Sequence, residues 1–377
     1  MPTSVEILEL GAVLLAAAAA GWVARRLTLP AVLGFLAVGI LVSPFTPGYV
    51  ASREHIGLLG EFGVVLLLFE VGIEINLGKV RREQRRLLIA APAQVLMTTA
   101  ITAGIFVAAG QQAATASVLG LAVALSSSVV IVNIVRSRKR RTNRATEATM
   151  LTWSVLQDVC GVLLAAILLS FAGVSDRTPA LALAGLGGFL AVAVAAAWLL
   201  PRALQRLGAE PDLLLIVPIG VGLSLAGVGA KAFGLPAALA AFIAGLVVSE
   251  SPESAVARRQ LMPFRDVFAV LFFVSVGTLI DPAAVMAGLP WLALVLFALV
   301  LGKVLVTAGA AAWARASRPL QVAVGMGQVG ELSFVLASLL IGAGLLTADI
   351  YAALLAAVVV SIVASTVGVR LHWQRAH

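Results

Sequence analysis

The sequence predicts an all-α polytopic membrane protein with thirteen transmembrane helices. Three observations support this fold class: the composition, the spacing of the apolar runs and the distribution of basic residues. Of the 377 residues, 61% are apolar and 12% are charged, against roughly 45–50% and 25% in soluble domains. Because a crossing takes about 20 apolar residues, this length holds about a dozen crossings and no sizeable water-soluble domain.

Apolar runs between polar residues or proline and glycine breaks define the predicted helices in chain order. The first run opens with Glu6 and Glu9 instead of the basic start of a removable secretory signal, so we expect a retained span. The predicted spans are 5–24, 30–44, 57–77, 87–109, 115–135, 148–171, 180–200, 211–230, 234–249, 263–280, 289–312, 320–343 and 348–371.

The basic residues of the loops predict the orientation of these spans. Alternate loops and the carboxyl tail hold 22 of the 26 Lys and Arg residues, whereas the opposite side holds three. Since cytoplasmic loops collect basic residues, we expect a cell (inner) membrane protein with an outside amino terminus and a cytoplasmic carboxyl terminus. The net charge of +8 is therefore an orientation signal. The basic loops 79–86 and 136–144 are expected to meet anionic lipid, and no nucleic-acid partner is expected.

Self-comparison predicts an internal repeat. Residues 29–43 align on 235–249 with seven identities in fifteen, and 63–76 align on 268–281 with five. The aligned spans lie seven crossings apart, an odd number, so the two units run in opposite directions through the membrane. The sequence thus predicts inverted repeats over spans 2–6 and 9–13, the architecture of many secondary transporters.

Two predicted spans contain a polar or glycine-rich interruption at corresponding places. Ser126, Ser127 and Ser128 lie in the middle of span 5 and map onto 331–333 of span 12, which Gly330 precedes. Backbone groups at this depth need partners other than water unless they line a cavity. We therefore expect two discontinuous helices that form a substrate site.

Asp158 is the most informative charged residue. It lies ten residues into span 148–171, or about 15 Å at the helical rise, near the bilayer midplane. Burial favours the neutral acid and a cation favours the carboxylate, so one group binds a proton or a monovalent metal cation but not both. Gln157 and the hydroxyls of Ser126–Ser128 offer neutral oxygen ligands. The alternative is a structural aspartate paired with Lys303.

Lys303 and Glu331 reach similar depth and are expected to be charge partners in the core. In the alternative, Lys303 itself releases a proton when a cation arrives.

Glu70 and Glu74 lie one turn apart towards the cytoplasmic end of span 3, where Lys79 and Arg81 offer polar surroundings. The chain has no nucleotide-binding, metal-spacing or nucleophile motif, so we expect neither an enzyme nor a cofactor.

The motifs resemble those of the Kef-type potassium/proton antiporters of the second monovalent cation:proton antiporter superfamily. The resemblance covers about residues 10–370 and is carried by these segments: GVVLLLFEVGIEI (63–75), LAVALSSS (121–128), VLQDV (155–159), LPAALAAFIAGLVVSES (235–251), PFRDVFAVLFFVSVGTLID (263–281) and GQVGELSFV (327–335).

The resemblance implies a homodimer that works as an elevator. It implies one transmembrane antiporter domain over 1–377, with an ion-binding core in which the broken spans cross. The site would be Gln157 and Asp158, with Ser127 and Ser128 nearby; a glutamine at 157 favours K+ over Na+. The implied parts are a scaffold and dimer part over 5–77 and 211–280, a core over 87–171 and 289–371, and a linking helix over 180–200.

Two features depart from the family pattern. Glu70 stands where members usually carry an aliphatic residue, so it is either an additional titrating group or a change in gating. Kef proteins continue into a cytoplasmic nucleotide-binding domain, which is not expected here because the sequence stops at His377. A separate cytoplasmic regulatory subunit is one alternative.

The sequence therefore predicts a secondary transporter that exchanges a monovalent cation, K+ or alternatively Na+, for H+. The rival readings are a cation channel and a sodium-coupled solute symporter on the same fold. An intramembrane hydrolase using Ser127 with Lys303 would need an oxyanion or base motif that the sequence lacks.

Overall fold

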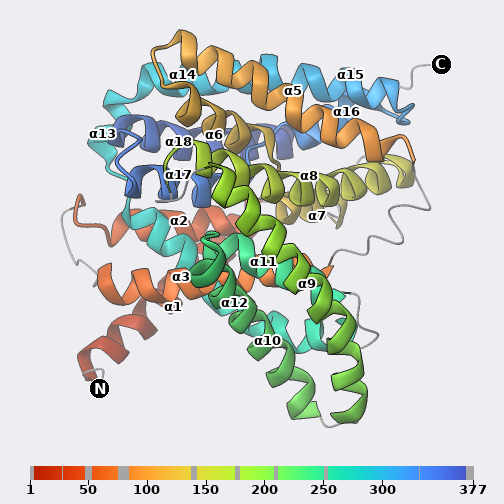
Figure 1. Ribbon diagram of the computed structural model, residues 1–377. Helices are drawn as coiled ribbons and strands as arrows, with labels where there is room; N and C mark the ends of the chain where they lie inside the picture. The colour runs from red at the N-terminus through yellow and green to blue at the C-terminus, as the bar shows by residue number, and fades with distance from the viewer. Residues whose placement is uncertain are drawn as a thin grey trace. The chain divides into compact units, whose positions relative to one another are not determined.

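The computed structural model describes residues 4–27, 29–46, 53–74, 85–136, 142–174, 179–207, 211–249, 254–330 and 332–370. Every regular element within these ranges is a helix (Figure 1), which confirms the all-α prediction. The chain divides into two compact units, each built from two separate segments: Met1–Leu77 with Ser175–Ile280, and Gly78–Val174 with Asp281–His377.

The first unit holds seven described helices, in which α3 packs on both α11 and α12 and α2 packs on α1 and α12. These helices are α1 (Ser4–Arg26), α2 (Ala31–Leu41), α3 (Arg53–Glu74), α9 (Pro179–Leu207), α10 (Pro211–Phe233), α11 (Ala237–Ser249) and α12 (Ser254–Thr278).

Glycines allow α2 and α12 to approach closely. A Cβ atom on Gly39 would lie within 3.0 Å of the Val274 carbonyl oxygen, and one on Gly277 would lie within 3.0 Å of the Leu36 carbonyl oxygen. Because real side chains do not tolerate such distances, only glycine fits this crossing.

The crossing of α3 and α11 has the same construction. A Cβ atom on Gly72 would come within 3.0 Å of the Phe242 carbonyl oxygen, and one on Gly245 would come equally close to that of Phe69. Small residues at helix crossings are the usual means of tight packing between membrane helices.

The second unit contains the broken helices, and in it α5 lies alongside α6, α8 and α15 (Figure 1). Its described helices are α5 (Leu87–Ala108), α6 (Ala113–Ala124), α7 (Ser128–Arg136), α8 (Arg144–Phe171), α13 (Pro282–Ala287), α14 (Leu289–Ala298), the π-helix η1 (Leu299–Val304), α15 (Leu305–Trp313), α16 (Pro319–Met326), α17 (Leu332–Gly342) and α18 (Ala348–Gly368).

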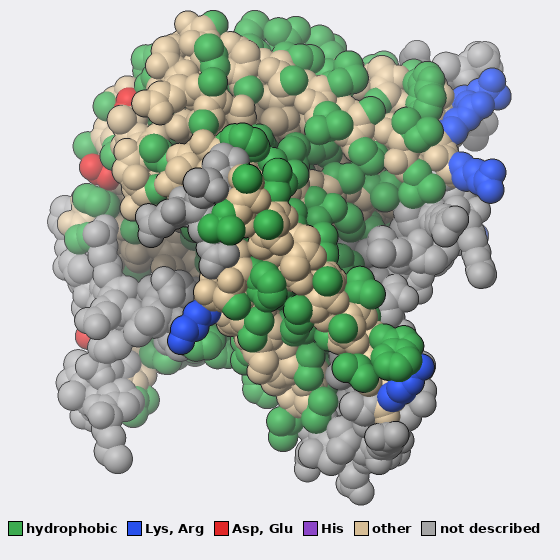
Figure 2. Space-filling model, viewed as in Figure 1, with side chains coloured by type: hydrophobic (Ala, Val, Ile, Leu, Met, Phe, Trp, Pro, Cys, Tyr) green, Lys and Arg blue, Asp and Glu red, His purple; other side chains and the backbone are tan. Residues whose placement is uncertain are grey.

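The described surface is suited to a bilayer. Seven described stretches of helix are long and apolar enough to cross a membrane, and five shorter apolar helices accompany them. Large apolar side chains such as Leu15, Val194 and Ile216 are more than 60% exposed, and Figure 2 shows apolar side chains spread over the visible face. Water would solvate such a surface poorly, whereas lipid tails solvate it well.

One helix extends well beyond the span that was predicted within it. The span predicted to begin at Pro263 belongs to α12, which begins at Ser254 and contains the proline. The preceding turns carry Arg258 and Arg259, so their polarity concealed a continuous helix. Proline removes one hydrogen bond and does not necessarily end a helix when its neighbours support the backbone.

Candidate ion-binding site

Two helices of the second unit are interrupted where the sequence predicted breaks. Residues 125–127 separate α6 from α7, and the second break begins at Gly327, after α16, and its described residues run to Gly330. Ser126, Ser127 and Gln328 in these breaks are buried. Buried backbone groups of this kind require partners from the protein.

The two breaks supply each other with those partners. The Gly330 amide donates to the Leu125 carbonyl at 2.9 Å, and Ser126 Oγ donates to the Met326 carbonyl at 2.7 Å. Gln328 reaches across with its whole amide: Oε1 accepts from the Ser127 amide at 3.0 Å, and Nε2 donates to the Ser127 carbonyl at 3.1 Å. Direct hydrogen bonds therefore hold the two interruptions together.

Lys303, from a third helical segment, forms hydrogen bonds with both breaks. It lies in η1, is fully buried, and its Nζ donates to the Leu125 carbonyl at 2.8 Å and the Gln328 carbonyl at 2.6 Å. Short π-helical segments occur frequently at functional sites. The ion pair expected with Glu331 concerns a residue outside the described part of the chain.

Ser127 and Ser128 mark the start of the half-helix α7. Ser127 Oγ accepts from the Val130 amide at 3.3 Å, which caps the first turn. Ser128 is the first residue of α7 and is half-buried. The amino terminus of α7, with its partial positive charge, therefore lies within the break.

α8 packs against the first break at Gln157, and Asp158 is the next residue along this helix. Gln157 is fully buried and Asp158 is 5% exposed. Gln157 Nε2 lies 3.4 Å from the Ala124 carbonyl oxygen at the end of α6. One turn further on, a Cβ atom on Gly161 would lie 2.6 Å from Leu125 Cδ2. Gln157 and Gly161 share a helix face, so this face of α8 packs against the break.

Gln94, Trp153 and Gln328 are buried polar residues close to the predicted site, and none of them was predicted from the sequence. Gln94 Oε1 accepts hydrogen bonds from Trp153 Nε1, at 3.2 Å, and from Gln157 Nε2. Ionisable residues at membrane depth stand out in the sequence, whereas these three side chains are neutral. The available signal was a glutamine within the apolar run 87–109 and another beside the glycines of span 12.

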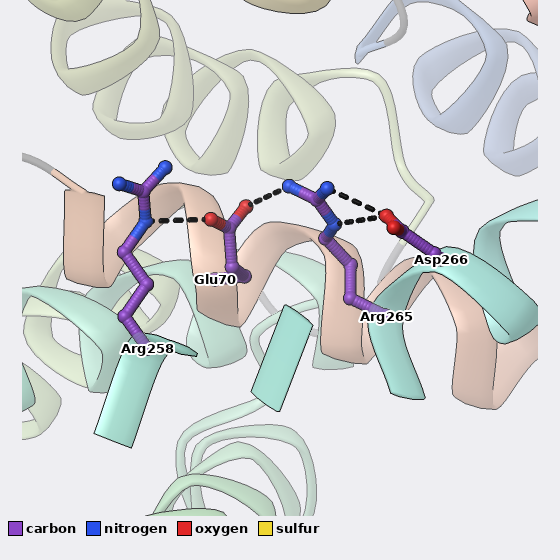
Figure 3. A network of polar contacts seen from close by, with 4 residues as sticks. All are labelled: Glu70, Arg258, Arg265 and Asp266. Atoms are coloured by element: carbon purple, nitrogen blue, oxygen red, sulfur yellow. Dashed lines mark hydrogen bonds and ion pairs between the residues drawn. The ribbon is translucent and has the colours of Figure 1, made fainter. Parts of the chain in front are cut away.

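Glu70 lies in the first unit, on α3, and is paired with arginines of α12. Its carboxylate accepts from Arg258 Nε at 2.8 Å and from Arg265 Nη1 at 2.7 Å, and Arg265 also bonds Asp266 (Figure 3). Glu70 is 1% exposed. The basic partners are thus Arg258 and Arg265; Lys79 and Arg81, the partners considered from the sequence, lie outside the described residues.

The donor atoms at the site are hard oxygens. Among the described residues, no three His, Cys, Asp or Glu side chains gather as they would around a transition metal. The residues predicted for the site, Asp158, Gln157 and Ser126–Ser128, would offer carboxylate, amide and hydroxyl oxygens. Carbonyl oxygens can replace the hydration shell of an alkali cation.

A comparison with known families assigns this architecture. The family described as "Sodium/hydrogen exchanger, transmembrane" matches residues 13–373. The chain belongs to this family. It is therefore a multi-pass membrane protein of a transporter family, in agreement with the expectation that it is not an enzyme.

This member of the sodium/hydrogen exchanger family also resembles a curated protein in sequence. "Putative cation/proton antiporter YbaL" of Escherichia coli (strain K12) is 29% identical over 338 residues, covering 85% of this chain and 60% of that protein. The chain thus spans less than two thirds of this relative.

Two solved structures of the sodium proton antiporter MjNhaP1 from Methanocaldococcus jannaschii share the fold. The structure at pH 8 gives a TM-score of 0.78 at 16% identity, over 96% of this chain and 96% of that chain. A second, from electron microscopy, gives 0.76 at 17% identity, over 98% and 96%.

Proposed function

We propose that this protein exchanges a monovalent cation for H+ across the membrane by alternating access, with Asp158 as the shared cation and proton site. The observation that carries the proposal is the meeting of two helix breaks, clamped by Lys303, against the α8 face that bears Gln157. Family membership and the names of the relatives support the same activity.

The chemistry follows from the environment of Asp158. A nearly buried carboxylate is costly unless a proton or a cation neutralises it. Each occupant excludes the other, so a cation that enters displaces the proton. Gln157, Ser127 and Ser128 contribute neutral oxygens, and the break carbonyls add further dipoles. One carboxylate serving two cations in turn is sufficient to couple their movements.

We infer thirteen crossings with inverted repeats, and the glycine crossings of the first unit support the repeat. The alignment pairs Gly39 with Gly245 and Gly72 with Gly277. In the structure, Gly39 meets Gly277 and Gly72 meets Gly245. The two crossings are therefore images of each other under the aligned numbering, as expected for a pseudo-two-fold axis.

The proposed division of labour is a mobile core and a stationary scaffold. The unit that contains the breaks, Asp158 and Lys303 would be the core, and the other unit would be the scaffold and dimer part. The proposed linking helix, 180–200, lies within α9. We further propose a homodimer in the cell (inner) membrane, with an outside amino terminus, a cytoplasmic carboxyl terminus and optional control by a separate cytoplasmic subunit.

Gln157 favours K+ as the exchanged ion, because Kef-type proteins carry this glutamine where electrogenic sodium/proton exchangers carry an acid. The names of the family and of MjNhaP1 favour Na+. A channel would pass ions without obligatory proton movement, and a sodium-coupled symporter would require a solute. These alternatives differ from antiport in one measurable property, the movement of protons in response to K+ or Na+ alone.

The deciding experiment is reconstitution into liposomes that contain a pH-sensitive dye. Addition of K+ or Na+ should move protons in wild-type vesicles, with the larger response to the physiological ion. Asp158→Asn should abolish the response, because an amide binds no exchangeable proton, while the purified protein keeps its oligomeric state. Exchange that persists in this variant would remove Asp158 from the proposed role.

A further inference from the structure

Gln94 is a buried side chain that the proposed exchange does not explain. It lies on α5 and is fully buried. Both the oxygen and the nitrogen of its side-chain amide make hydrogen bonds. Its Oε1 accepts from Trp153 Nε1, at 3.2 Å, and from Gln157 Nε2, while its Nε2 donates to Thr98 Oγ1 at 3.0 Å. Trp153 and Gln157 lie one turn apart on α8, so Gln94 bridges consecutive turns of the helix that carries Asp158.

The direction of these hydrogen bonds is fixed by Trp153. An indole N–H is a donor and never an acceptor. Gln94 therefore has to present its oxygen to Trp153, because a flipped amide would place two donors against each other. The same oxygen then requires a donor from Gln157, which has to present its NH2 group. Thr98 does not decide the direction, since a hydroxyl serves as donor or acceptor.

The end of α6 favours the same orientation. The Ala124 carbonyl is an acceptor only, and it lies 3.5 Å from Gln94 Nε2 and 3.4 Å from Gln157 Nε2. Both contacts are long, yet each would become repulsive if the glutamine that makes it were reversed, because two acceptor oxygens would then face each other. Trp153 and Ala124 therefore select one rotamer of the Gln157 amide from opposite sides.

This orientation leaves one atom of Gln157 for another use. With its nitrogen committed to Gln94 and Ala124, Gln157 Oε1 is buried and has no hydrogen-bond partner among the described residues. A buried amide oxygen without a partner is costly. The next residue along the helix is the Asp158 carboxylate, and an oxygen dipole at this position suits a dehydrated alkali cation.

We propose that Gln94 is a positioning residue that holds the Gln157 amide with its oxygen directed to the transported cation. The inference rests on the proposed function and adds a residue that does not itself touch the ion. Trp153 acts one step further back by fixing the direction of Gln94. The relay Trp153, Gln94, Gln157 then supplies a neutral ligand of defined orientation beside the single carboxylate.

The test separates binding from turnover in proteoliposomes. Gln94→Met keeps the volume and removes the acceptor, so the Gln157 amide is free to rotate. We expect the apparent KM for the cation to rise about tenfold, as for the loss of one oriented polar contact, with less than about a twofold change in maximal rate. Trp153→Phe should raise KM in the same direction by about threefold.

A double-mutant cycle distinguishes positioning from general destabilisation. If Gln94 acts through Gln157, then Gln94→Met should raise KM no further in a Gln157→Met background. Gln321 on α16 offers a matched control. It is a fully buried glutamine, and it donates a hydrogen bond to the Val369 carbonyl at 3.2 Å. Gln321→Met should leave KM unchanged.

The outcomes separate the two proposals. Loss of exchange in Asp158→Asn together with an unchanged KM in Gln94→Met would overturn the positioning role and leave the exchange mechanism standing. Additive effects of the Gln94 and Gln157 substitutions would also overturn it. Exchange that survives Asp158→Asn would instead contradict the proposed role of Asp158 as the shared cation and proton site.

Discussion

Lys303 is a fully buried lysine whose described partners are two backbone carbonyls. Its ammonium group bonds Leu125 in one break and Gln328 in the other. Hydrogen bonds from a charged donor are stronger than neutral ones, and at membrane depth no water replaces them. This geometry supports a structural role for Lys303, which holds two discontinuous helices in one arrangement.

We predict that Lys303→Met destabilises the protein. The substitution leaves two buried carbonyls without their charged donor and should lower the free energy of unfolding by about 2 kcal/mol. Thermal unfolding in detergent provides the measurement. Lys303→Gln, which keeps an NH2 donor without the charge, should recover part of the loss and retain cation-driven proton movement.

The alternative role for Lys303 gives a different pattern. If its ammonium releases a transported proton, then Lys303→Gln would change the number of protons moved per cation while the unfolding temperature stayed near wild type. Measurement of stoichiometry and stability on the same preparation therefore decides between the two roles.

At the scale of elements, α3 and α12 are joined by one buried carboxylate. Glu70 on α3 binds Arg258 and Arg265, which lie seven residues, about two turns, apart on α12. The guanidinium groups are 31% and 21% exposed, whereas Glu70 is 1% exposed. Removal of the buried partner should therefore cost more than removal of either exposed one.

We predict that Glu70→Gln lowers the free energy of unfolding by about 3 kcal/mol. This value is the lower end for a broken buried pair, because water partly screens the arginines. The matched control is Asp266→Asn, which removes the other carboxylate of Arg265; that carboxylate is 64% exposed. This control should cost less than about 0.5 kcal/mol.

The same pair of variants tests the alternative for Glu70. A second titrating group would make Glu70→Gln shift the pH profile of exchange with little loss of stability. An unfolding temperature close to wild type combined with such a shift would contradict the structural role.

The breaks were predictable from sequence because their residues are unusual at membrane depth. Three consecutive serines and a run of glycines stand out in apolar helices. The mutual hydrogen bonding of these breaks was not predictable, since Gln328 and Ser127 lie far apart in the sequence and meet only in the folded chain. Gln94 was missed because a neutral amide carries no charge to draw notice, and the start of α12 was missed because an arginine-rich turn lowers the local hydropathy.

At the scale of the whole molecule, the glycine crossings of the first unit bear on the proposed internal repeat. The crossings of α2 with α12 and of α3 with α11 each depend on a pair of glycines. If the two halves of the chain are inverted copies, equivalent glycines occupy equivalent environments. Their substitution should then carry equivalent costs, although they lie about two hundred residues apart.

We therefore predict that Gly39→Ala and Gly245→Ala lower the unfolding temperature to a similar degree. Each added methyl group would overlap a backbone carbonyl of the facing helix, at Val274 and at Phe69 respectively, so the helices have to separate and lose contact area. The control is Gly227→Ala on α10, where nothing lies within 4 Å of the added atom. There, alanine should stabilise the helix by up to about 1 kcal/mol. Clearly unequal losses at Gly39 and Gly245, or an equal loss at Gly227, would contradict the pseudo-symmetric crossing and with it the strongest structural support for the inverted repeat.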